Sequence, residues 1–379
     1  MDFNSLTKEV QNNNSSINKS NTPVIKKKKK PHSNKELELL IHDIYKNIPL
    51  EEINNNLEYY IYSVKDLYYE FEKVKESEDY IINEITNLFN SRLIVEPPIY
   101  NENDISKITK IIEFLKLVPQ PEQRTPEWYI FRNNRLTASD LATALNKNPY
   151  SRRKDLILKK CGHETPWKPG AAILHGVKYE DVAILIYSVR NKVKVVEYGC
   201  VPHPNIPFFG ASPDGICDPE SENRQKIGYM LEIKCPKSRP ITGFPPEYYE
   251  YQVQGQLEVC DLEYCDFLEC NIQEYNNKKE YIDDSILYKD GNININYQKN
   301  GLEKGVVIEL YDHNLKKSIF KYGDLNMTKE KLETWEEKII DESLETPTID
   351  YLSTSYWKLK DYCCTLIKRD KERFKEMYI

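Results

Sequence analysis

The chain has 379 residues, with 53 Lys and Arg against 60 Asp and Glu, and its formal net charge is −7. This length allows two or three domains with ample core. The sequence contains no apolar run of about 18 residues, the length of a membrane span. It also begins without an apolar signal segment, so we expect a soluble, intracellular protein. The nine cysteines form no C-x-x-C pair, which favours reduced thiols over an iron–sulfur cluster.

The first part of the chain shows no catalytic motif. Residues 1–33 are rich in Asn, Ser and Lys, with five consecutive lysines at residues 26–30, and this composition predicts a disordered basic tail. A solvated tail is favoured, and a nuclear-import signal or a nonspecific DNA tether are the alternatives. Residues 34–118 have apolar residues at helical spacing and predict a helical accessory region. Residues 119–121, Pro-Gln-Pro, are the predicted linker to the rest.

The first motif is R-x-x-R-L-T-A-S at residues 132–139. Thr125 followed by a proline predicts the start of a helix that carries Arg132 and Arg135. Ser139 is predicted to cap the next helix. A guanidinium and a hydroxyl at a helix start form a phosphate site. The alternative is an ordinary helix cap beside surface arginines.

One long helix is predicted over residues 171–191, which contain the motif G-x-x-Y-E-x-x-A. Its buried face is predicted from residues at four- and three-residue spacing: Ile173, Val177, Glu180, Ile184 and Tyr187. A carboxylate among apolar neighbours needs a cation, which is either a shared metal ion or an Arg or Lys of the core.

Two apolar runs, residues 207–216 and 227–235, flank a polar stretch and predict a β-hairpin. The first run holds Asp214 in the motif S-P-D-G, and the second holds Glu232 and Lys234 in L-E-I-K. Alternation along the second strand places its apolar side chains on one face and the two charged ones on the other. Carboxylate oxygens suit Mg²⁺ or Mn²⁺. The alternative is a surface salt bridge between Glu232 and Lys234.

A loop with Pro and Gly follows, and its Lys237 and Arg239 are placed to contact backbone phosphates. The next predicted helix, residues 246–260, carries the motif Y-x-x-x-Q-x-Q. Gln252 is the predicted orienting amide, and Gln254 is its alternative. Glutamines that simply face solvent are the other interpretation.

The rest of the sequence predicts an extension of the sheet. Strands are predicted at residues 264–272 and 306–311, and the tail from residue 328 is predicted as helix-like segments. Residues 121–240 contain 19 Lys and Arg against 13 Asp and Glu, a net charge of +6, whereas the remainder carries −13. The region with the motifs is therefore locally basic, as a phosphate-binding surface requires.

Taken together, the five motifs, in this order and spacing, resemble the phage lambda exonuclease and YqaJ-like viral recombinase family of the PD-(D/E)XK nuclease superfamily. The resemblance covers about residues 124–275. It implies an α/β fold with a restriction-endonuclease-like core, a mixed central sheet flanked by helices, over residues 119–280. A helical N-terminal region precedes this core. A strand and helix extension at residues 281–379 is expected to pack on it.

The resemblance implies a metal site. Asp214 and Glu232 match the metal-binding acids of the family, and the carbonyl of Ile233 is a further ligand. Glu180 matches the helical acid of a second metal position. The implied cofactor is Mg²⁺, as one or two ions, with Mn²⁺ as the alternative.

The resemblance also implies roles for residues around this metal site. Lys234 is similar to the lysine that orients or deprotonates the attacking water, and Gln252 matches the family glutamine. Arg132 and Ser139 keep the spacing of the arginine and serine that hold the terminal 5′-phosphate. Arg135 is expected to assist them.

The implied activity is that of a Mg²⁺-dependent deoxyribonuclease. By resemblance it degrades one strand from the 5′ end of duplex DNA and exposes a 3′ single strand for recombination or repair. A structure-specific or restriction-like endonuclease and a noncatalytic DNA-binding protein on the same fold are the alternatives. The implied partners are double-stranded DNA ends and a single-strand annealing protein, and a homo-oligomer is compatible with the family. A nuclear location or a viral replication compartment is expected.

Overall fold

The computed structural model describes residues 34–48, 52–53, 56–70, 78–93, 97–163, 170–288 and 292–378. The chain divides into two compact units, Met1–Glu96 with Thr242–Phe244, and Pro97–Ile241 with Pro245–Ile379. The predicted tail at residues 1–33 lies outside the described residues. None of the helices in the described part of the chain combines the length and apolar character that a membrane span requires.

The described part of the first unit is helical, as the sequence predicts. Its longer helices are α2 (Asn34–Asn47), α4 (Leu57–Glu70) and α5 (Glu78–Leu93). Each helix contributes apolar side chains to one shared core: Leu37 and Ile41, Val64, and Ile85 and Phe89. Burial of these side chains holds the unit together, because short isolated helices are only marginally stable in water.

The second unit begins with a helix that the sequence assigns to the accessory region. This helix, α6 (Glu102–Leu117), buries Ile105, Ile112 and Leu115 in the core of the second unit. The predicted linker at residues 119–121 is packed as well, since the Gln120 side chain bonds to the Leu115 carbonyl and the Gly199 amide, both at 2.8 Å. The chain therefore divides at residues 96–97 and not at the predicted boundary after residue 118.

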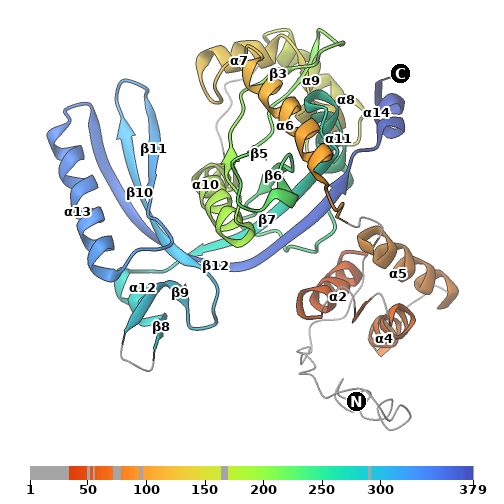
Figure 1. The fold of residues 1–379 in the computed structure, drawn as a ribbon, viewed down its shortest axis with the longest axis horizontal. Helices are drawn as coiled ribbons and strands as arrows, with labels where there is room; N and C mark the ends of the chain where they lie inside the picture. The colour runs from red at the N-terminus through yellow and green to blue at the C-terminus, as the bar shows by residue number, and fades with distance from the viewer. Residues whose placement is uncertain are drawn as a thin grey trace. The chain divides into compact units, whose positions relative to one another are not determined.

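The second unit is built on a mixed seven-stranded sheet, which agrees with the predicted α/β class (Figure 1). The strand order is β11-β10-β12-β7-β6-β5-β2. β6 and β7 are parallel, and the other neighbouring pairs are antiparallel. The strands are β2 (Val195–Val196), β5 (Gly215–Cys217), β6 (Met230–Lys234), β7 (Tyr264–Glu274), β10 (Lys304–Asp312), β11 (Lys317–Tyr322) and β12 (Ile349–Lys368).

Two small sheets and several helices complete the second unit. The small sheets are β1 (Leu136–Thr137), β4 (Phe209–Ala211) and β3 (Val201–Pro202), and β8 (Ser285–Leu287) with β9 (Ile293–Gln298). The helices are α7 (Pro126–Asn133), α8 (Leu141–Ala144), α9 (Arg153–Lys160), α10 (Ala171–Asn191), α11 (Glu247–Cys260), α12 (Lys278–Asp283), α13 (Lys329–Glu345) and α14 (Lys371–Tyr378). The 3₁₀ helices are η1 (Ala138–Asp140) and η2 (Arg224–Lys226).

The predicted hairpin forms between β5 and β6, but its first run is divided between two sheets. β4 pairs with β1 and β3 in the small sheet, whereas β5 pairs with β6 in the large one. The residues between β4 and β5 include Asp214, which therefore sits where the chain crosses from one sheet to the other. This crossing brings the S-P-D-G motif beside β6.

Two long helices cover opposite faces of the strands around β6. α11 packs on the side of Met230, and α10 packs on the side of Leu231 and Ile233. The buried face of α10 shares only Tyr187 with the predicted one. Its buried side chains are Tyr179, Val182, Ala183, Ile186 and Tyr187. Ile173, which the sequence predicts to be buried, is 45% exposed. Glu180 is half-buried and lies at the edge of the buried face.

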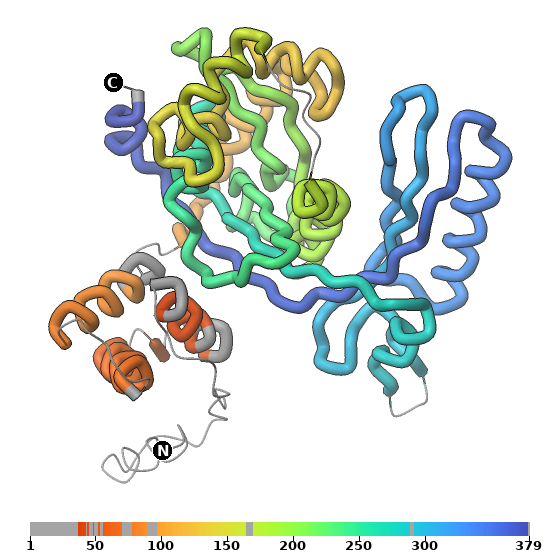
Figure 2. Tube along the Cα trace, turned by 180° about the vertical axis from the view of Figure 1, so that it is seen from behind, coloured from red at the N-terminus to blue at the C-terminus, as the bar shows by residue number. Residues whose placement is uncertain are grey.

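The C-terminal tail contains two of the helix-like segments that the sequence predicts, but a long strand that the sequence does not predict lies between them. Only α13 and the short α14 are helical in the described residues after 328, and β12 lies between them. β12 pairs with β10 through its first half and with β7 through its second half. Figures 1 and 2 show it running from the β10–β11 hairpin to α14. The C-terminal extension is thus part of the central sheet.

Candidate active site

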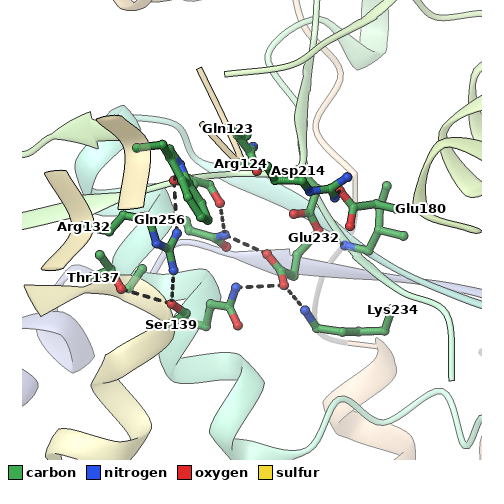
Figure 3. Close-up of a pocket in the computed structure, with 15 residues that line it drawn as sticks. Gln123, Arg124, Arg132, Thr137, Ser139, Glu180, Asp214, Glu232, Lys234 and Gln256 are labelled. Carbon is green, nitrogen blue, oxygen red and sulfur yellow. Dashed lines mark hydrogen bonds and ion pairs between the residues drawn. The ribbon is translucent and has the colours of Figure 1, made fainter. Parts of the chain in front are cut away.

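Four ionisable residues that the sequence singles out meet in one pocket of about 220 Å³: Glu180, Asp214, Glu232 and Lys234. They come from three separate parts of the chain, as Figure 3 shows. Glu180 is in the middle of α10, Asp214 follows β4, and Glu232 and Lys234 share β6. Alternation along β6 is as predicted, because its apolar side chains enter the core while the two charged ones face the pocket.

Glu232 is the centre of a hydrogen-bond network and is only 1% exposed. Its Oε1 accepts from the Lys234 ammonium and from Gln252 Nε2, the latter at 2.8 Å. Its Oε2 accepts from Gln256 Nε2 at 2.7 Å. Donors on both oxygens offset the cost of burying this carboxylate.

The two glutamines that bond to Glu232 are one turn apart on α11. Gln252 therefore has the position that the sequence predicts for the orienting amide. Its alternative, Gln254, faces the other way: its Nε2 donates to the Lys368 carbonyl at 2.9 Å and its Oε1 accepts from the Asp370 amide at 2.7 Å. Residues four apart on a helix share a face, whereas residues two apart do not.

Asp214 is held against β6 by the backbone. Its Oδ2 accepts from the Ile233 amide at 2.6 Å, and the Asp214 amide donates to the Leu231 carbonyl at 3.2 Å. Burial raises the pKa of Asp214 well above its ordinary value, and the carboxylates of Glu232 and Glu180 raise it further. Carboxylates this close to Asp214 favour additional positive charge in the pocket.

Lys234 is a strongly held cation in this pocket. Burial lowers its pKa, but the Glu232 and Asp214 carboxylates outweigh that effect, and its pKa is raised above the ordinary value. Its Nζ also lies 4.7 Å from the centre of the Tyr249 ring. An ammonium held in this way donates hydrogen bonds, and both predicted roles for this lysine stay predictions.

The third acid of the pocket is paired with an arginine that the sequence analysis does not single out. Arg124 Nη2 donates to Glu180 Oε1 at 2.7 Å. Burial raises the pKa of Glu180 and its acidic neighbours add to this, although Arg124 opposes it. The ion pair links the turn before α7 to the middle of α10.

The three carboxylates of the pocket suit a hard divalent cation, although other groups of the protein already bond to their oxygens. Three carboxylates line one pocket, and carboxylate oxygens are the ligands that Mg²⁺ and Mn²⁺ prefer. Ile233, whose carbonyl is the further predicted ligand, lines the same pocket. The described residues contain no group of three or more His, Cys, Asp or Glu side chains already arranged to hold a metal ion. In this arrangement the Lys234 ammonium contacts Glu232, and the Arg124 guanidinium contacts Glu180.

On the other side of the same pocket, a guanidinium is fixed between two hydroxyls. Arg132 Nη2 donates to Ser139 Oγ at 2.9 Å and its Nη1 donates to Ser212 Oγ at 3.2 Å. The guanidinium carbon lies 4.2 Å from the centre of the Trp128 ring, and Trp128 Nε1 also donates to Ser212 Oγ, at 3.1 Å. A guanidinium carries five N–H donors, more than these two hydroxyls use, and its planar fork matches a phosphate.

The local structure around Ser139 differs from the prediction in one respect. α7 begins as predicted, with Thr125 Oγ1 accepting from the Trp128 amide at 3.2 Å. Ser139, however, lies within η1, and Thr137 is the residue that precedes this helix. The Thr137 amide and hydroxyl bond to Asp140 Oδ2. The Ser139 hydroxyl bonds to Arg132 and lies 3.0 Å from the Thr137 hydroxyl.

The other three basic residues proposed for DNA contact lie outside this pocket. Arg135 stacks on Phe131, with its guanidinium carbon 3.6 Å from the ring centre. Arg239 is paired with the fully buried Glu269 at 2.5 Å and so has a structural partner. Lys237 is exposed. Contacts of these residues with DNA remain a prediction.

Sequence reasoning missed several residues of the pocket, among them Gln256, Ser212 and Arg124. Gln256 could be found from its spacing of four from Gln252, which places both on one helix face. Ser212 is the first residue of S-P-D-G, and its position in that motif is the only signal for it. Arg124 has no sequence signal, because its contact with Glu180 spans 56 residues and depends on the tertiary fold.

Comparison with known proteins gives a family match and viral relatives. Residues 127–263 match the family model of the YqaJ-like viral recombinase domain. The chain is 34% identical over 302 residues to the uncharacterized protein R354 of Acanthamoeba polyphaga mimivirus, a match that covers 73% of this chain and 54% of that protein. It is 26% identical over 162 residues to a protein of African swine fever virus (strain Badajoz 1971 Vero-adapted), covering 37% and 46%. The chain thus spans about half the length of these curated relatives.

A solved structure is also similar to this chain. It is the alkaline exonuclease LHK-Exo from Laribacter hongkongensis, with 21% sequence identity and a TM-score of 0.37. The likeness covers 67% of this chain and 87% of that one. All five motifs lie within the residues that the family model matches. The predicted resemblance is therefore confirmed, and residues 127–263 are similar to the YqaJ-like viral recombinase domain.

Proposed function

We propose that the chain is a metal-dependent DNA exonuclease on a PD-(D/E)XK core. It degrades one strand from the 5′ end of duplex DNA and exposes a 3′ single strand for recombination or repair. The observation that carries the proposal is the meeting of Glu180, Asp214, Glu232 and Lys234 in one pocket. Strand polarity rests on the family resemblance.

The carboxylates supply what phosphodiester hydrolysis needs from the protein. Glu180, Asp214 and Glu232 would hold one or two Mg²⁺ or Mn²⁺ ions, with the Ile233 carbonyl as a further ligand. Such an ion, when bound, polarises the phosphate and makes water a nucleophile near neutral pH. Other groups of the chain hold two of these carboxylates in position. The glutamine side chains of α11 bond to Glu232, and a backbone amide of β6 bonds to Asp214.

Lys234 orients the attacking water in this proposal. Its ammonium already contacts Glu232 and is held protonated by the neighbouring carboxylates, which raise its pKa. A protonated lysine donates hydrogen bonds and offsets negative charge that develops on the phosphate. Gln252 adds an uncharged donor that does not compete with the acids for a cation.

The Arg132 side of the pocket holds the terminal 5′-phosphate in this proposal. Arg132 is kept in place by the two serine hydroxyls and by the Trp128 ring, so little conformational entropy is lost when a phosphate binds. Because Arg132 and the carboxylates line one pocket, a bound 5′ end lies close to the site of hydrolysis. That proximity favours cleavage at an end over cleavage within a strand.

Partners and location complete the proposal. Double-stranded DNA ends are the substrate, and the family resemblance supports a single-strand annealing partner and a homo-oligomer. The relatives reported above are viral proteins, which supports action in a viral replication compartment.

The proposal is tested with linear duplex DNA that carries a 5′-phosphate and a separate label on each strand. With Mg²⁺ we expect loss of label from the 5′ ends, persistence of the 3′ strands, and no digestion in EDTA. Closed circular duplex should stay intact under the same conditions. Digestion of the circle would support the endonuclease alternative, and absence of any digestion would contradict a nuclease.

A further inference from the structure

Arg124 lies in the same pocket, yet the proposed chemistry gives it no role. Its Nη2 donates to Glu180 Oε1 at 2.7 Å, and the side chains of the pair are 34% and 20% exposed. Figure 3 shows its guanidinium between the carboxylates of Glu180 and Asp214. Arg124 therefore lies beside the carboxylates of the pocket, whereas Arg132 lies on the other side.

The backbone of Arg124 is strained. Its φ is 62°, in the left-handed region that glycine adopts without cost and other residues rarely adopt. The turn is fixed on both sides. Gln123 Nε2 donates to the Tyr198 and Pro213 carbonyls at 2.8 and 3.1 Å, and Thr125 Oγ1 donates to the Glu122 carbonyl at 2.7 Å. A strained position that carries a long charged side chain, and not glycine, points to a function of that side chain.

The guanidinium interacts with more acids than its direct partner. Burial lowers the pKa of Arg124, but Glu180, Asp181, Glu197 and Asp214 outweigh this and raise it. A divalent cation on Glu180 would stand within a few ångströms of this positive group, and like charges at such distances in a partly buried site repel strongly. The guanidinium also occupies one of the two Glu180 oxygens that a cation could use.

We infer that Arg124 is a counter-ion that takes the place of the divalent cation at Glu180 and must leave this carboxylate when the cation binds. The inference rests on the proposed function only in taking Glu180 as a cation ligand. It follows that the chain binds divalent cations more weakly than its carboxylates alone would. Arg124 is thus a positioning residue that sets the cation affinity of the pocket.

The experiment measures Mn²⁺ binding by calorimetry in the absence of DNA, using the full chain. Arg124→Ala and Arg124→Gly both remove the guanidinium, but only the glycine also relieves the backbone. Both variants are expected to bind Mn²⁺ about two- to fivefold more tightly, the change in Kd that corresponds to a partly exposed ion pair. Arg124→Lys keeps a cation and should stay closer to the wild type than to Arg124→Ala.

A matched control separates the local effect from the loss of one positive charge. Arg224 forms an exposed ion pair with Glu102 at 2.7 Å and does not line the pocket. Arg224→Ala should leave the Kd for Mn²⁺ unchanged. Thermal unfolding gives a second readout: Mn²⁺ should raise the Tm of Arg124→Ala more than that of the wild type, because tighter binding stabilises the folded state more.

The possible results separate this inference from the proposed function. If the wild type binds Mn²⁺ and digests DNA while Arg124→Ala binds Mn²⁺ with unchanged or weaker affinity, the inference is overturned and the nuclease proposal stands. If only Arg124→Gly binds more tightly, the backbone and not the guanidinium is responsible, and the inference is again overturned. If neither wild type nor variants bind Mn²⁺, both fail.

Discussion

Glu232 is the side chain that the pocket constrains most. A carboxylate buried to this degree is costly unless each oxygen has a donor, and here α11 supplies an amide to each oxygen. Gln256 is itself 1% exposed, and its Nε2 is shared between Glu232 and the Ser212 carbonyl. Its Oε1 has no hydrogen-bond partner among the described atoms, although it is buried. That oxygen is a suitable acceptor for a water in the pocket.

The role of Gln256 can be separated from that of its neighbour by one pair of variants. Gln256→Leu removes the donor to Glu232 Oε2 and should slow digestion about tenfold, because hydrogen bonds to charged groups contribute on the order of 1.5–3 kcal/mol, of which only part is specific to the transition state. Gln254→Leu should leave the rate unchanged and lower the free energy of unfolding, since Gln254 bonds only to the Lys368 and Asp370 backbone. Digestion rates and urea unfolding measure the two effects. Equal slowing in both variants would contradict the assignment.

The other residue-scale prediction concerns the end of the DNA strand. Arg132→Ala removes the guanidinium held by Ser139 and Ser212 and should abolish the preference for a 5′-phosphate over a 5′-hydroxyl. The preference is measured as the ratio of digestion rates on the two duplexes. Arg152, an exposed arginine paired with Asp155, provides the control, and Arg152→Ala should keep the preference. A preference that survives in Arg132→Ala would remove this residue from the end-binding role.

Among the elements, β6 shows what a local sequence pattern can predict. Its alternation is readable from four residues, because the period of a strand is two and the apolar and charged residues therefore fall on opposite faces. The start of α7 is equally readable from its Thr-Pro pair. These local rules place Glu232, Lys234 and Arg132 correctly.

Other elements could not be predicted because tertiary contacts decide them. α10 has apolar residues nearly all round, so several stripes fit its sequence, and packing against the sheet selects the one that contains Tyr179 and Ile186. β12 has polar and aromatic residues on both faces, and its strand state depends on pairing with β10 and β7. The Arg124–Glu180 pair likewise has no local signal.

The packing between β10 and β12 yields a prediction at the scale of elements. Gly305 lies opposite Trp357, and a Cβ on Gly305 would stand 2.7 Å from Trp357 Cζ2. Gly305→Ala should therefore lower the free energy of unfolding by about 1–3 kcal/mol, the usual cost of overpacking. The fully buried indole cannot move aside easily.

A second glycine provides the matched control, measured by the same urea unfolding. A Cβ on Gly176, in α10, would meet no atom within 4 Å. Gly176→Ala should raise the free energy of unfolding by about 0.5–1 kcal/mol, because alanine loses less entropy in a helix. A stabilising Gly305→Ala would show that β12 does not pack on β10 in this way.

For the molecule as a whole, the pocket belongs to one unit. All its lining residues fall within Pro97–Ile241 and Pro245–Ile379. The C-terminal strand is also central to this unit, since β12 has a neighbour on each side in the seven-stranded sheet. The unit that contains the pocket thus includes the C-terminal strand, whereas α2, α4 and α5 belong to the other unit.

Two truncations test this division. A chain that ends at Glu345 lacks β12 and exposes the edges of β7 and β10, so it should fail to fold, as seen in circular dichroism and in aggregation during purification. A chain that begins at Pro97 keeps every residue of the pocket and should still digest linear duplex DNA. Retained folding without β12, or loss of digestion when only the residues before Pro97 are removed, would contradict this division of roles.

The central claim is that the residues around Glu232 hydrolyse DNA, and Lys234→Ala tests it most directly. The measurement is the single-turnover digestion rate of 5′-phosphorylated linear duplex in Mg²⁺, together with the Kd for the same DNA. Lys192, an exposed lysine paired with Glu222, provides the control variant Lys192→Ala. We predict that Lys234→Ala loses at least about 100-fold in rate, the scale of a lost catalytic group, while its Kd for DNA stays near that of the wild type. Digestion by Lys234→Ala at the wild-type rate would contradict the account.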